Sequence, residues 1–295
     1  MRSNILRAAV ALAFSLVPVS VRAQDSACPF DRSTLQFAGT PLEQARCLLR
    51  PVLPSGHPAA QLKNPPDPLA KIIGKKPGVA KTDLRRYLNS KNISESELGG
   101  SLDDLLSTGT LPDGRTTPAQ YLVIHDVSTP NYLEKTFPDN INDASWEWND
   151  LAKRWANTKV AHVFVNRLGQ SVTAVDFGSA LPPKRFGTKF ARDNLQERAK
   201  GLQLHIELVQ PRRSDSSGKA GNDAIAPLPG FTEAQLDRLA LLYLAASVRR
   251  GEWLVPAFHA DVDAGIPEAH DDPQNFDLEL WAKRLQKLLK DVKGE

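Results

Sequence analysis

Imidazole and carboxylate side chains are concentrated in residues 255–277, VPAFHADVDAGIPEAHDDPQNFD. This segment holds two of the six histidines in the chain and five aspartates. Asp, Gly and Pro are ordinary turn residues, so a solvated loop is one explanation of this composition. A metal site is the other, because histidine nitrogens and aspartate oxygens are ligands of Zn²⁺.

Two further histidines lie in apolar segments that precede this loop. His125 ends the run YLVIH, and His162 lies within VAHVFVN. A catalytic zinc site uses three protein ligands and leaves one position open for water. His125, His259 and one aspartate of the sequence HDDP, either Asp271 or Asp272, can supply such a set. Any one of these histidines alone is more often a hydrogen-bonded structural residue, so it is the combination that indicates a metal.

The residues around these histidines predict buried strands. Short apolar runs predict strands at residues 121–125, 160–166 and 171–175, and RLGQ is the turn between the last two. Residues 202–209, LQLHIELV, alternate in character, which predicts a strand with one face in the core and the other along a cleft. Glu207 lies on the cleft side of this alternation.

Helices are predicted between and after these strands. Residues 144–156, ASWEWNDLAKRWA, have helical character. Residues 231–250 predict a helix in which Thr232 is the N-cap and Gln235 completes a capping box. A final helix is expected over about residues 277–291, and its buried stripe consists of Leu280, Trp281, Leu285 and Leu288. This order of elements predicts an α/β fold with a mixed central β-sheet flanked by helices.

The preceding part of the chain, residues 24–117, predicts an irregular N-terminal extension. Proline and glycine are too frequent there for long regular elements, although short helices are expected near residues 41–49 and 81–90. A small accessory domain, a spacer and a flap over the main domain, residues 118–295, are all compatible with this composition. Cys28 and Cys47 can form a disulfide in an oxidising compartment.

Residues 1–23 have the layout of a cleaved export signal. Two arginines precede an apolar run over residues 8–19, and small residues lie just before Gln24. The run is short for a membrane span. We therefore expect a periplasmic or extracellular mature chain without a membrane span, and an uncleaved anchor is the alternative.

The charge balance argues against some partners. The chain has 37 Lys and Arg and 34 Asp and Glu, and residues 1–23 hold three arginines and no acid, so the mature chain has equal numbers of each sign. A neutral chain offers no electrostatic basis for binding nucleic acid or an anionic membrane surface. The sequence contains neither GxxxxGK[ST] nor GxGxxG, so a phosphate-binding loop is not indicated.

Five segments follow one another as do the blocks of a known enzyme family: YLVIHDVSTP, AHVFVNRLGQ, LHIELVQ, FTEAQLDRLALLYLAA and FHADVDAGIPEAHDDPQNFD. Over residues 118–290 the chain resembles the type 2 zinc-dependent N-acetylmuramoyl-L-alanine amidases, which are related to peptidoglycan recognition proteins. The resemblance implies one Zn²⁺ per chain, held by His125, His259 and Asp272. It also implies that Glu207 acts on the attacking water.

The resemblance implies an exported enzyme that hydrolyses the amide bond between N-acetylmuramic acid and L-alanine in peptidoglycan or muropeptides. Zinc lowers the pKa of bound water and polarises a carbonyl group. Glu207 would move the proton, a role worth about 10²–10⁴ in rate. A peptidoglycan-binding module of the same fold without catalysis is the first alternative. A zinc hydrolase that acts on another amide is the second.

The sequence departs from the family pattern in the loop that carries Asp272. His270 occupies a position where the family often has a lysine that stabilises the oxyanion, and we expect His270 to assist the transition state in its place. The interval from His259 to Asp272 is also a few residues longer than in simple members. We interpret His162 as a structural residue or an outer partner of the site, and His205 as a candidate for the cleft.

Overall fold

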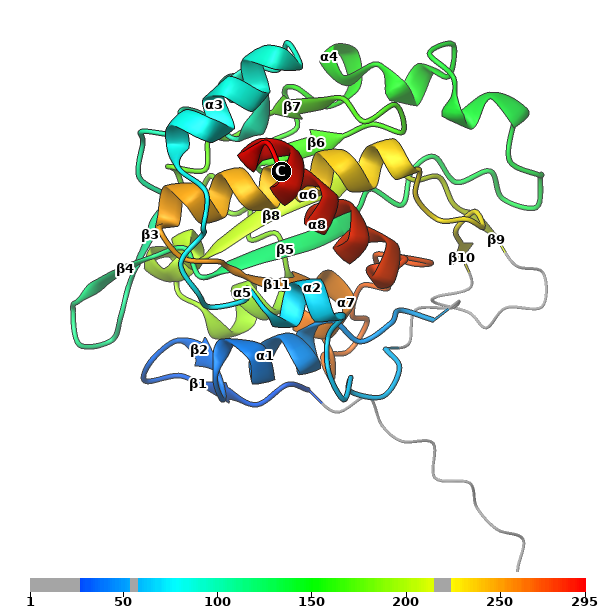
Figure 1. Ribbon diagram of the computed structural model, residues 1–295. Coiled ribbons are helices and arrows are strands. Elements are labelled where there is room, and N and C mark those ends of the chain that lie inside the picture. The colour runs from blue at the N-terminus through cyan, green and yellow to red at the C-terminus, as the bar shows by residue number, and fades with distance from the viewer. Residues whose placement is uncertain (1–26, 54–57, 215–223) are drawn as a thin grey trace, which may run out of the picture.

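The computed structural model describes residues 27–53, 58–214 and 224–295 (Figure 1). The predicted export signal, residues 1–23, lies outside these ranges. Across the described ranges, no helix is both long enough and apolar enough to cross a membrane.

A five-stranded mixed sheet forms the centre of the molecule, as the sequence predicts. Its spatial order is β11-β5-β8-β6-β7. The strands are β5 (Tyr121–Asp126), β6 (Val163–Val165), β7 (Ser171–Thr173), β8 (Gln203–Leu208) and β11 (Val255–Phe258). The first four strands in the spatial order are parallel, and β7 is antiparallel to β6. The carboxyl ends of the parallel strands therefore meet at one edge, where ligand sites in such sheets commonly lie.

The register of β5 and β8 brings chemically active side chains together. Val123 lies opposite His205, and His125 lies opposite Glu207. Opposite residues of neighbouring strands project from the same face of a sheet. The other face is apolar and packs in the main core through Leu122, Ile124, Leu204, Ile206 and Leu208. The predicted alternation in β8 is thus confirmed.

The sequence did not predict β11, whose residues were assigned to the loop that carries the histidines. Pro256 lies within this strand and pairs with Leu122 of β5. Proline lacks a backbone N–H, and it is accepted here because β11 is the edge strand of the sheet.

Two long helices, α6 (Glu233–Arg250) and α8 (Leu278–Lys293), pack against each other over the apolar face of the sheet (Figure 1). The predicted capping box of α6 is present, with Thr232 accepting from the backbone N–H of Gln235. The rings of Tyr243 and Trp281 lie 5.5 Å apart between the two helices. Apolar spacing predicts both helices, and the capping box also predicts the start of α6.

The predicted helix at residues 144–156 is wrong as a continuous element. The structure has short turns there instead, namely η2 (Asp139–Asn142), η3 (Glu147–Asn149) and the one-turn helix α4 (Leu151–Arg154). The Asp150 side chain caps α4 by accepting from Lys153 N–H, so a new helix starts at this point. Trp155 stacks on Phe164 at 5.2 Å in a second, smaller core, which holds this segment without a long helix.

The N-terminal segment contains the short elements β1 (Phe30–Asp31), β2 (Gln36–Phe37), α1 (Pro41–Leu48), α2 (Asp67–Ala70), α3 (Lys81–Ser90), η1 (Glu95–Leu98), β3 (Thr108–Thr110) and β4 (Thr116–Pro118). The two helices expected near residues 41–49 and 81–90 are α1 and α3. The expected disulfide between Cys28 and Cys47 is present.

This N-terminal segment shares the main hydrophobic core with the sheet. The backbone N–H of Phe37 donates to the hydroxyl of Tyr121 on β5 at 2.9 Å. Arg50 forms a buried ion pair with Asp261 at 2.9 Å, in the short helix α7 (His259–Val262). In Figure 1 the blue elements β1, β2 and α1 lie beneath α7 and α5 (Lys189–Asn194).

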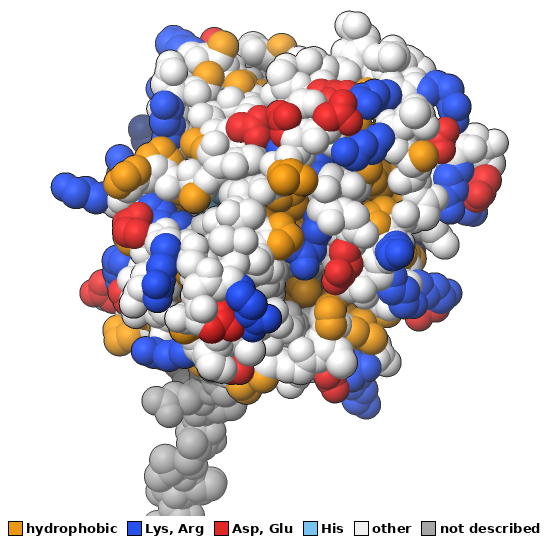
Figure 2. All heavy atoms as spheres, turned by 90° about the vertical axis from the view of Figure 1, so that its left-hand side faces the viewer, with side chains coloured by type: hydrophobic (Ala, Val, Ile, Leu, Met, Phe, Trp, Pro, Cys, Tyr) orange, Lys and Arg blue, Asp and Glu red, His pale blue; other side chains and the backbone are white. Residues whose placement is uncertain are grey.

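The remaining short elements are η4 (Glu197–Leu202), β9 (Arg213–Ser214) and β10 (Ala224–Ile225). The face of the molecule shown in Figure 2 carries basic and acidic side chains interspersed with small hydrophobic groups. On this face there is no broad area of a single charge, in agreement with the equal numbers of basic and acidic residues over positions 24–295.

Candidate metal centre

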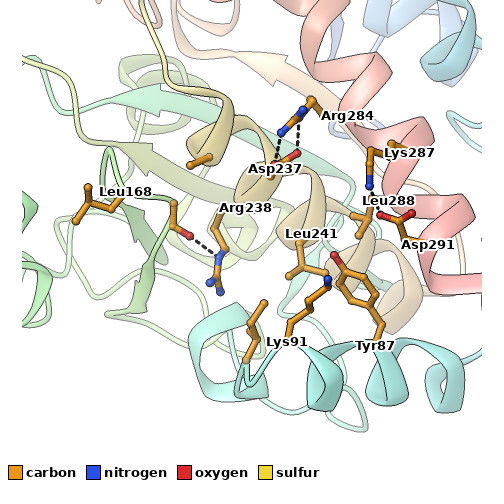
Figure 3. Close-up of a pocket in the computed structure, with 13 residues that line it drawn as sticks. Tyr87, Lys91, Leu168, Asp237, Arg238, Leu241, Arg284, Lys287, Leu288 and Asp291 are labelled. Atoms are coloured by element: carbon orange, nitrogen blue, oxygen red, sulfur yellow. Dashed lines mark hydrogen bonds and ion pairs between the residues drawn. The ribbon is translucent and has the colours of Figure 1, made fainter. Parts of the chain in front are cut away.

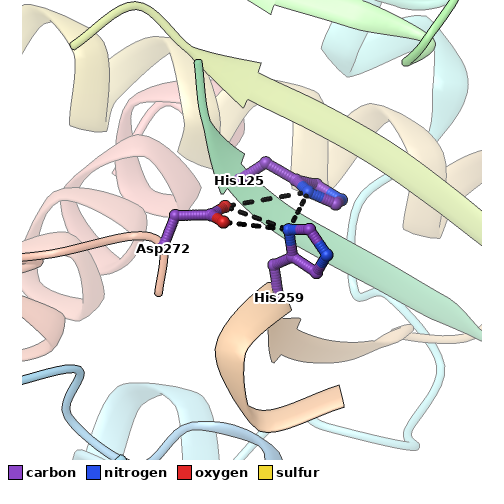
Figure 4. Close-up of side chains that lie close together, drawn as sticks. All are labelled: His125, His259 and Asp272. Carbon is purple, nitrogen blue, oxygen red and sulfur yellow. Dashed lines mark hydrogen bonds and ion pairs between the residues drawn. The ribbon is translucent and has the colours of Figure 1, made fainter. Parts of the chain in front are cut away.

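Three side chains from separate segments converge at the carboxyl edge of the sheet (Figure 4). His125 lies at the end of β5, His259 is the first residue of α7 directly after β11, and Asp272 lies in the following loop. All three are buried, and one potential ligand atom from each lies within 4.8 Å of the others.

The spacing of these ligand atoms fits one zinc ion. His125 Nδ1 lies 2.9 Å from His259 Nδ1, and His259 Nδ1 lies 3.0 Å from Asp272 Oδ1. His125 Nδ1 lies 3.8 Å from Asp272 Oδ2. Tetrahedral zinc with bonds of about 2.0–2.1 Å separates its ligand atoms by roughly 3.3 Å. Of the two aspartates left open by the sequence, Asp272 is in this group, whereas Asp271 accepts from Gln274 Nε2 at 2.8 Å.

Asp272 is held in place by the backbone. The N–H of Asp126 donates to its Oδ2 at 3.0 Å, and the N–H of Ala260 donates to its carbonyl oxygen at 2.8 Å. The side chain of Asp126 in turn accepts from Arg212 Nη2 at 2.8 Å in a buried ion pair. Burial raises the pKa of Asp126 to about 6, against the opposing effect of Arg212. The loop with Asp272 is therefore anchored to β5 rather than free to move.

A line of buried imidazoles continues from His125. His125 Nε2 lies 2.9 Å from Nδ1 of His205, and the backbone N–H of His205 donates to Nδ1 of His162. The other ring nitrogen of His162 lies 3.1 Å from the carbonyl oxygen of Ser179. Because Nε2 of His125 faces His205, its other ring nitrogen, Nδ1, is the one that faces the metal centre. His162 is thus structural, and His205 supports His125 from the protein interior.

The surroundings shift the pKa values of the two imidazoles, His125 and His259, in opposite directions. Burial, followed by the charge of His259, lowers the pKa of His125 well below its usual value. Burial also acts to lower the pKa of His259, but the carboxylates of Asp272 and Asp263 outweigh it and hold that pKa well above its usual value. A metal ion would therefore compete with a proton for Nδ1 of His259.

A cavity of about 490 Å³ opens next to this centre. Glu207, His259, His270 and Asp272 line it. Oε2 of Glu207 is buried and has no hydrogen-bond partner among the described residues. Burial, reinforced by the Asp272 carboxylate, raises the pKa of Glu207 well above its usual value. An unsatisfied carboxylate with a raised pKa in a cavity is suited to proton transfer.

His270 lies at the mouth of the same cavity. Its side chain is 56% exposed, its ring stacks on that of His259 at 4.5 Å, and its Nδ1 lies 3.8 Å from Asp272 Oδ1. Burial of part of the ring and the charge of His259 lower the pKa of His270. A neutral ring at this place can donate one N–H into the cavity.

Two features of this site are not predicted by the sequence. One is the basic wall of the cavity, formed by Lys184, Arg185, Lys189 and Arg192. The other is Asp263, whose carboxylate accepts from His259 Nε2 at 3.0 Å. The only sequence signal for Asp263 is its position four residues after a histidine, which places two side chains on the same side of a helical turn.

A second cavity, of about 350 Å³, lies between α3, α6 and α8 (Figure 3). Both of its carboxylates are already paired, since Arg284 bonds to Asp237 and Lys287 to Asp291. No histidine is among the described residues that line it. This cavity therefore offers no metal-binding set, and the chemistry is concentrated in the first cavity.

No protein-family model matches the chain, and no curated protein matches it significantly. Among solved structures, it is similar to the Ph2119 endolysin from Thermus scotoductus MAT2119 bacteriophage Ph2119, with 15% identity and a TM-score of 0.30 over 58% of this chain and 87% of the endolysin. It is also similar to a selenomethionine derivative of AmpD, with 20% identity and a TM-score of 0.33 over 64% of this chain and 96% of that one. At this distance the function has to be argued from the residues of the site.

Proposed function

We propose that this protein is an exported zinc-dependent N-acetylmuramoyl-L-alanine amidase that acts on peptidoglycan or its muropeptides. The observation that carries the proposal is the convergence of His125, His259 and Asp272 beside the unpartnered carboxylate of Glu207. The four residues have the types and places that the sequence resemblance implies. A module that only binds peptidoglycan has no need of a buried proton acceptor beside a metal-binding set.

His125 Nδ1, His259 Nδ1 and an oxygen of Asp272 would hold the zinc ion. When bound, zinc would polarise the substrate carbonyl and lower the pKa of a water molecule. Glu207 takes a proton from the attacking water, whose oxygen adds to the carbonyl carbon of the muramic acid lactyl group. Glu207 then returns that proton to the nitrogen of L-alanine as the C–N bond breaks. The products are a carboxyl group on the sugar and a free stem peptide.

His270 and the basic wall support this assignment. His270 lies beside Asp272 at the cavity, and the N–H of its neutral ring would stabilise negative charge on the carbonyl oxygen as the water adds. Lys184 and Arg185 line the cavity and are exposed at its wall. Stem peptides of peptidoglycan carry free carboxylates, and cationic side chains beside a cleft raise the local concentration of an anionic substrate.

The proposal is tested by mass spectrometry of peptidoglycan fragments after incubation with the zinc-loaded protein. Free stem peptide that begins at L-alanine is the expected product, and Glu207→Gln should abolish it while still binding zinc. Glu134→Gln is the matched control, because Glu134 is exposed and does not line the cavity. Cleavage within the peptide would instead indicate a zinc hydrolase of another amide. Zinc binding and retention on peptidoglycan without any cleavage would indicate a recognition module.

Export is tested on the protein as the cell makes it. We expect the mature chain to begin at Gln24, because residues 1–23 have the layout of a cleaved signal. Intact mass measurement of the protein from the periplasmic or extracellular fraction checks this. A full-length mass in the membrane fraction would favour an uncleaved anchor.

A further inference from the structure

The two ring nitrogens of His259 face different groups. Nδ1 faces His125 and Asp272, the other members of the metal centre. Nε2 lies 3.0 Å from Oδ2 of Asp263, four residues further along the chain. A histidine that binds a metal through one nitrogen usually donates its other ring N–H to a carboxylate or a carbonyl group, which fixes the tautomer and the orientation of the ring.

Asp263 has the environment of such an outer partner. Its side chain is completely buried, and it accepts three N–H groups: one from His259 and two from the backbone of Lys189 and Phe190. The two backbone bonds are 3.0 and 2.7 Å long and come from the first two residues of α5. The carboxylate is therefore held by a second element and cannot rotate away from His259 without breaking these bonds.

The backbone bonds also connect the metal centre to the wall of the cavity. Residues 184–189, which lead into α5, line the cavity beside His259 and His270. One carboxylate thus joins a metal-binding histidine to the segment that forms the substrate side of the site. Neither Asp272 nor Glu207 makes a comparable link to α5 among the hydrogen bonds of the described residues.

We propose that Asp263 is a positioning residue. It holds His259 as the Nε2–H tautomer, with the Nδ1 lone pair directed at the metal, and it fixes the position of the first turn of α5 next to His259. This inference rests on the proposed function, because it assumes that His259 is a metal ligand. It concerns a residue that does not touch the metal or the substrate itself. Asparagine cannot replace Asp263 fully, since its single acceptor oxygen cannot serve three N–H donors.

The test is the zinc affinity of Asp263→Asn, measured by competition with a chelator, beside the wild-type protein and two controls. We expect binding about 10- to 100-fold weaker than wild type, the usual effect of removing an outer partner of a ligand. Thr188→Ala removes the other side-chain cap of α5, the bond to Ala191 N–H, and leaves Asp263 in place. Asp193→Asn removes an exposed carboxylate of α5 that pairs with Arg192. Both controls should keep wild-type affinity.

Equal zinc affinity in Asp263→Asn and wild type would overturn the inference. A loss of affinity in Thr188→Ala as large as that in Asp263→Asn would also overturn it, because the loss would then come from loosening α5. A second measurement does not depend on the variant folding. Long-range ¹H–¹⁵N spectra of the zinc-loaded wild-type protein should show His259 protonated at Nε2, and zinc on Nε2 would contradict the proposal. If the wild-type protein binds no zinc, the proposed function itself fails. If the wild-type protein and Asp263→Asn bind zinc equally well, only the inference about Asp263 fails.

Discussion

At the scale of single residues, the side chains that would hold a metal differ from the side chain that would move a proton. His125, His259 and Asp272 face one another at distances suited to one ion, and each is fixed by a hydrogen bond to a neighbouring residue. Glu207 lacks such a bond at Oε2. A buried carboxylate without a partner costs stability, and functional sites are where proteins retain such groups.

His270 gives the first prediction at this scale. Replacing it with alanine should lower kcat by about 10² and change KM much less, because its N–H is needed only as negative charge develops on the substrate oxygen. Steady-state kinetics on a soluble muropeptide would measure both constants. His270→Gln keeps an N–H donor and should retain more activity than His270→Ala. An unchanged kcat in the alanine variant would remove His270 from the mechanism.

The pH dependence of zinc binding is the second prediction. The Asp272 and Asp263 carboxylates raise the pKa of His259, which favours a second proton on its ring, and the proton on Nδ1 must leave before a metal can bind there. Zinc affinity should therefore increase with pH, by up to about tenfold per pH unit for one released proton, until the pH passes the raised pKa. Chelator competition at several pH values checks the slope. An affinity that does not change between mildly acidic and alkaline pH would contradict this protonation state.

At the scale of elements, the site depends on close approach between loops and strands. The loop ahead of α5 passes directly over the ring of His205 at Gly187, where φ is +76°. A Cβ at this glycine would lie 2.4 Å from His205 Cε1. Since His205 bonds to His125, the backbone at Gly187 is one support of the metal centre.

This contact predicts the effect of Gly187→Ala. The substitution should destabilise the protein by about 1–3 kcal/mol beyond the strain of a left-handed alanine, because the His205 ring must move. It should also weaken zinc binding through His125. Gly251→Ala is the matched control, with φ +79° and no atom within 4 Å of the added Cβ. Denaturant unfolding and zinc competition measure the two effects, and equal results for both variants would show that the contact with His205 is unimportant.

At the scale of the whole molecule, the N-terminal segment is packed against the metal-binding part of the chain. It contributes to the main core, and α1 contacts β11 and α7, the two elements that precede and contain His259. The buried ion pair between Arg50 and Asp261 joins the N-terminal segment to α7, two residues after His259. We propose that residues 24–117 are an extension integrated with the catalytic domain, and we expect the two parts to unfold together.

The disulfide allows this expectation to be tested. Cys28 and Cys47 are 19 residues apart, and a loop of that size predicts a contribution of about 3 kcal/mol to stability. The double variant Cys28→Ala, Cys47→Ala should therefore unfold at a lower temperature, in one transition rather than two. Calorimetry measures both features, and a reducing agent should destabilise the wild-type protein but not the variant. Two separate transitions would show that the N-terminal segment is an independent domain.

The sequence by itself determined the elements whose signals are local. An apolar run identified β5, and alternation identified β8. The capping box at Thr232 identified the start of α6, and helical spacing identified α8. These predictions succeed because buried side chains recur every two residues in strands and every three to four residues in helices. The same local reading failed at residues 144–156, where Trp146 and Trp155 pack into a separate small core.

Only the tertiary structure decided which chemical groups meet. The contact between His125 and His259 spans 134 positions in the chain, and that between Asp263 and Lys189 spans 74. Such pairs depend on the order of strands in the sheet and on the edge strand β11. The sequence pattern does not predict β11, which contains a proline. Residue types and a family resemblance named the metal-binding set in advance. The contact of His205 with His125 and the bonds of Asp263 to the backbone of α5 have no local signal, because they arise only when the segments carrying them pack together.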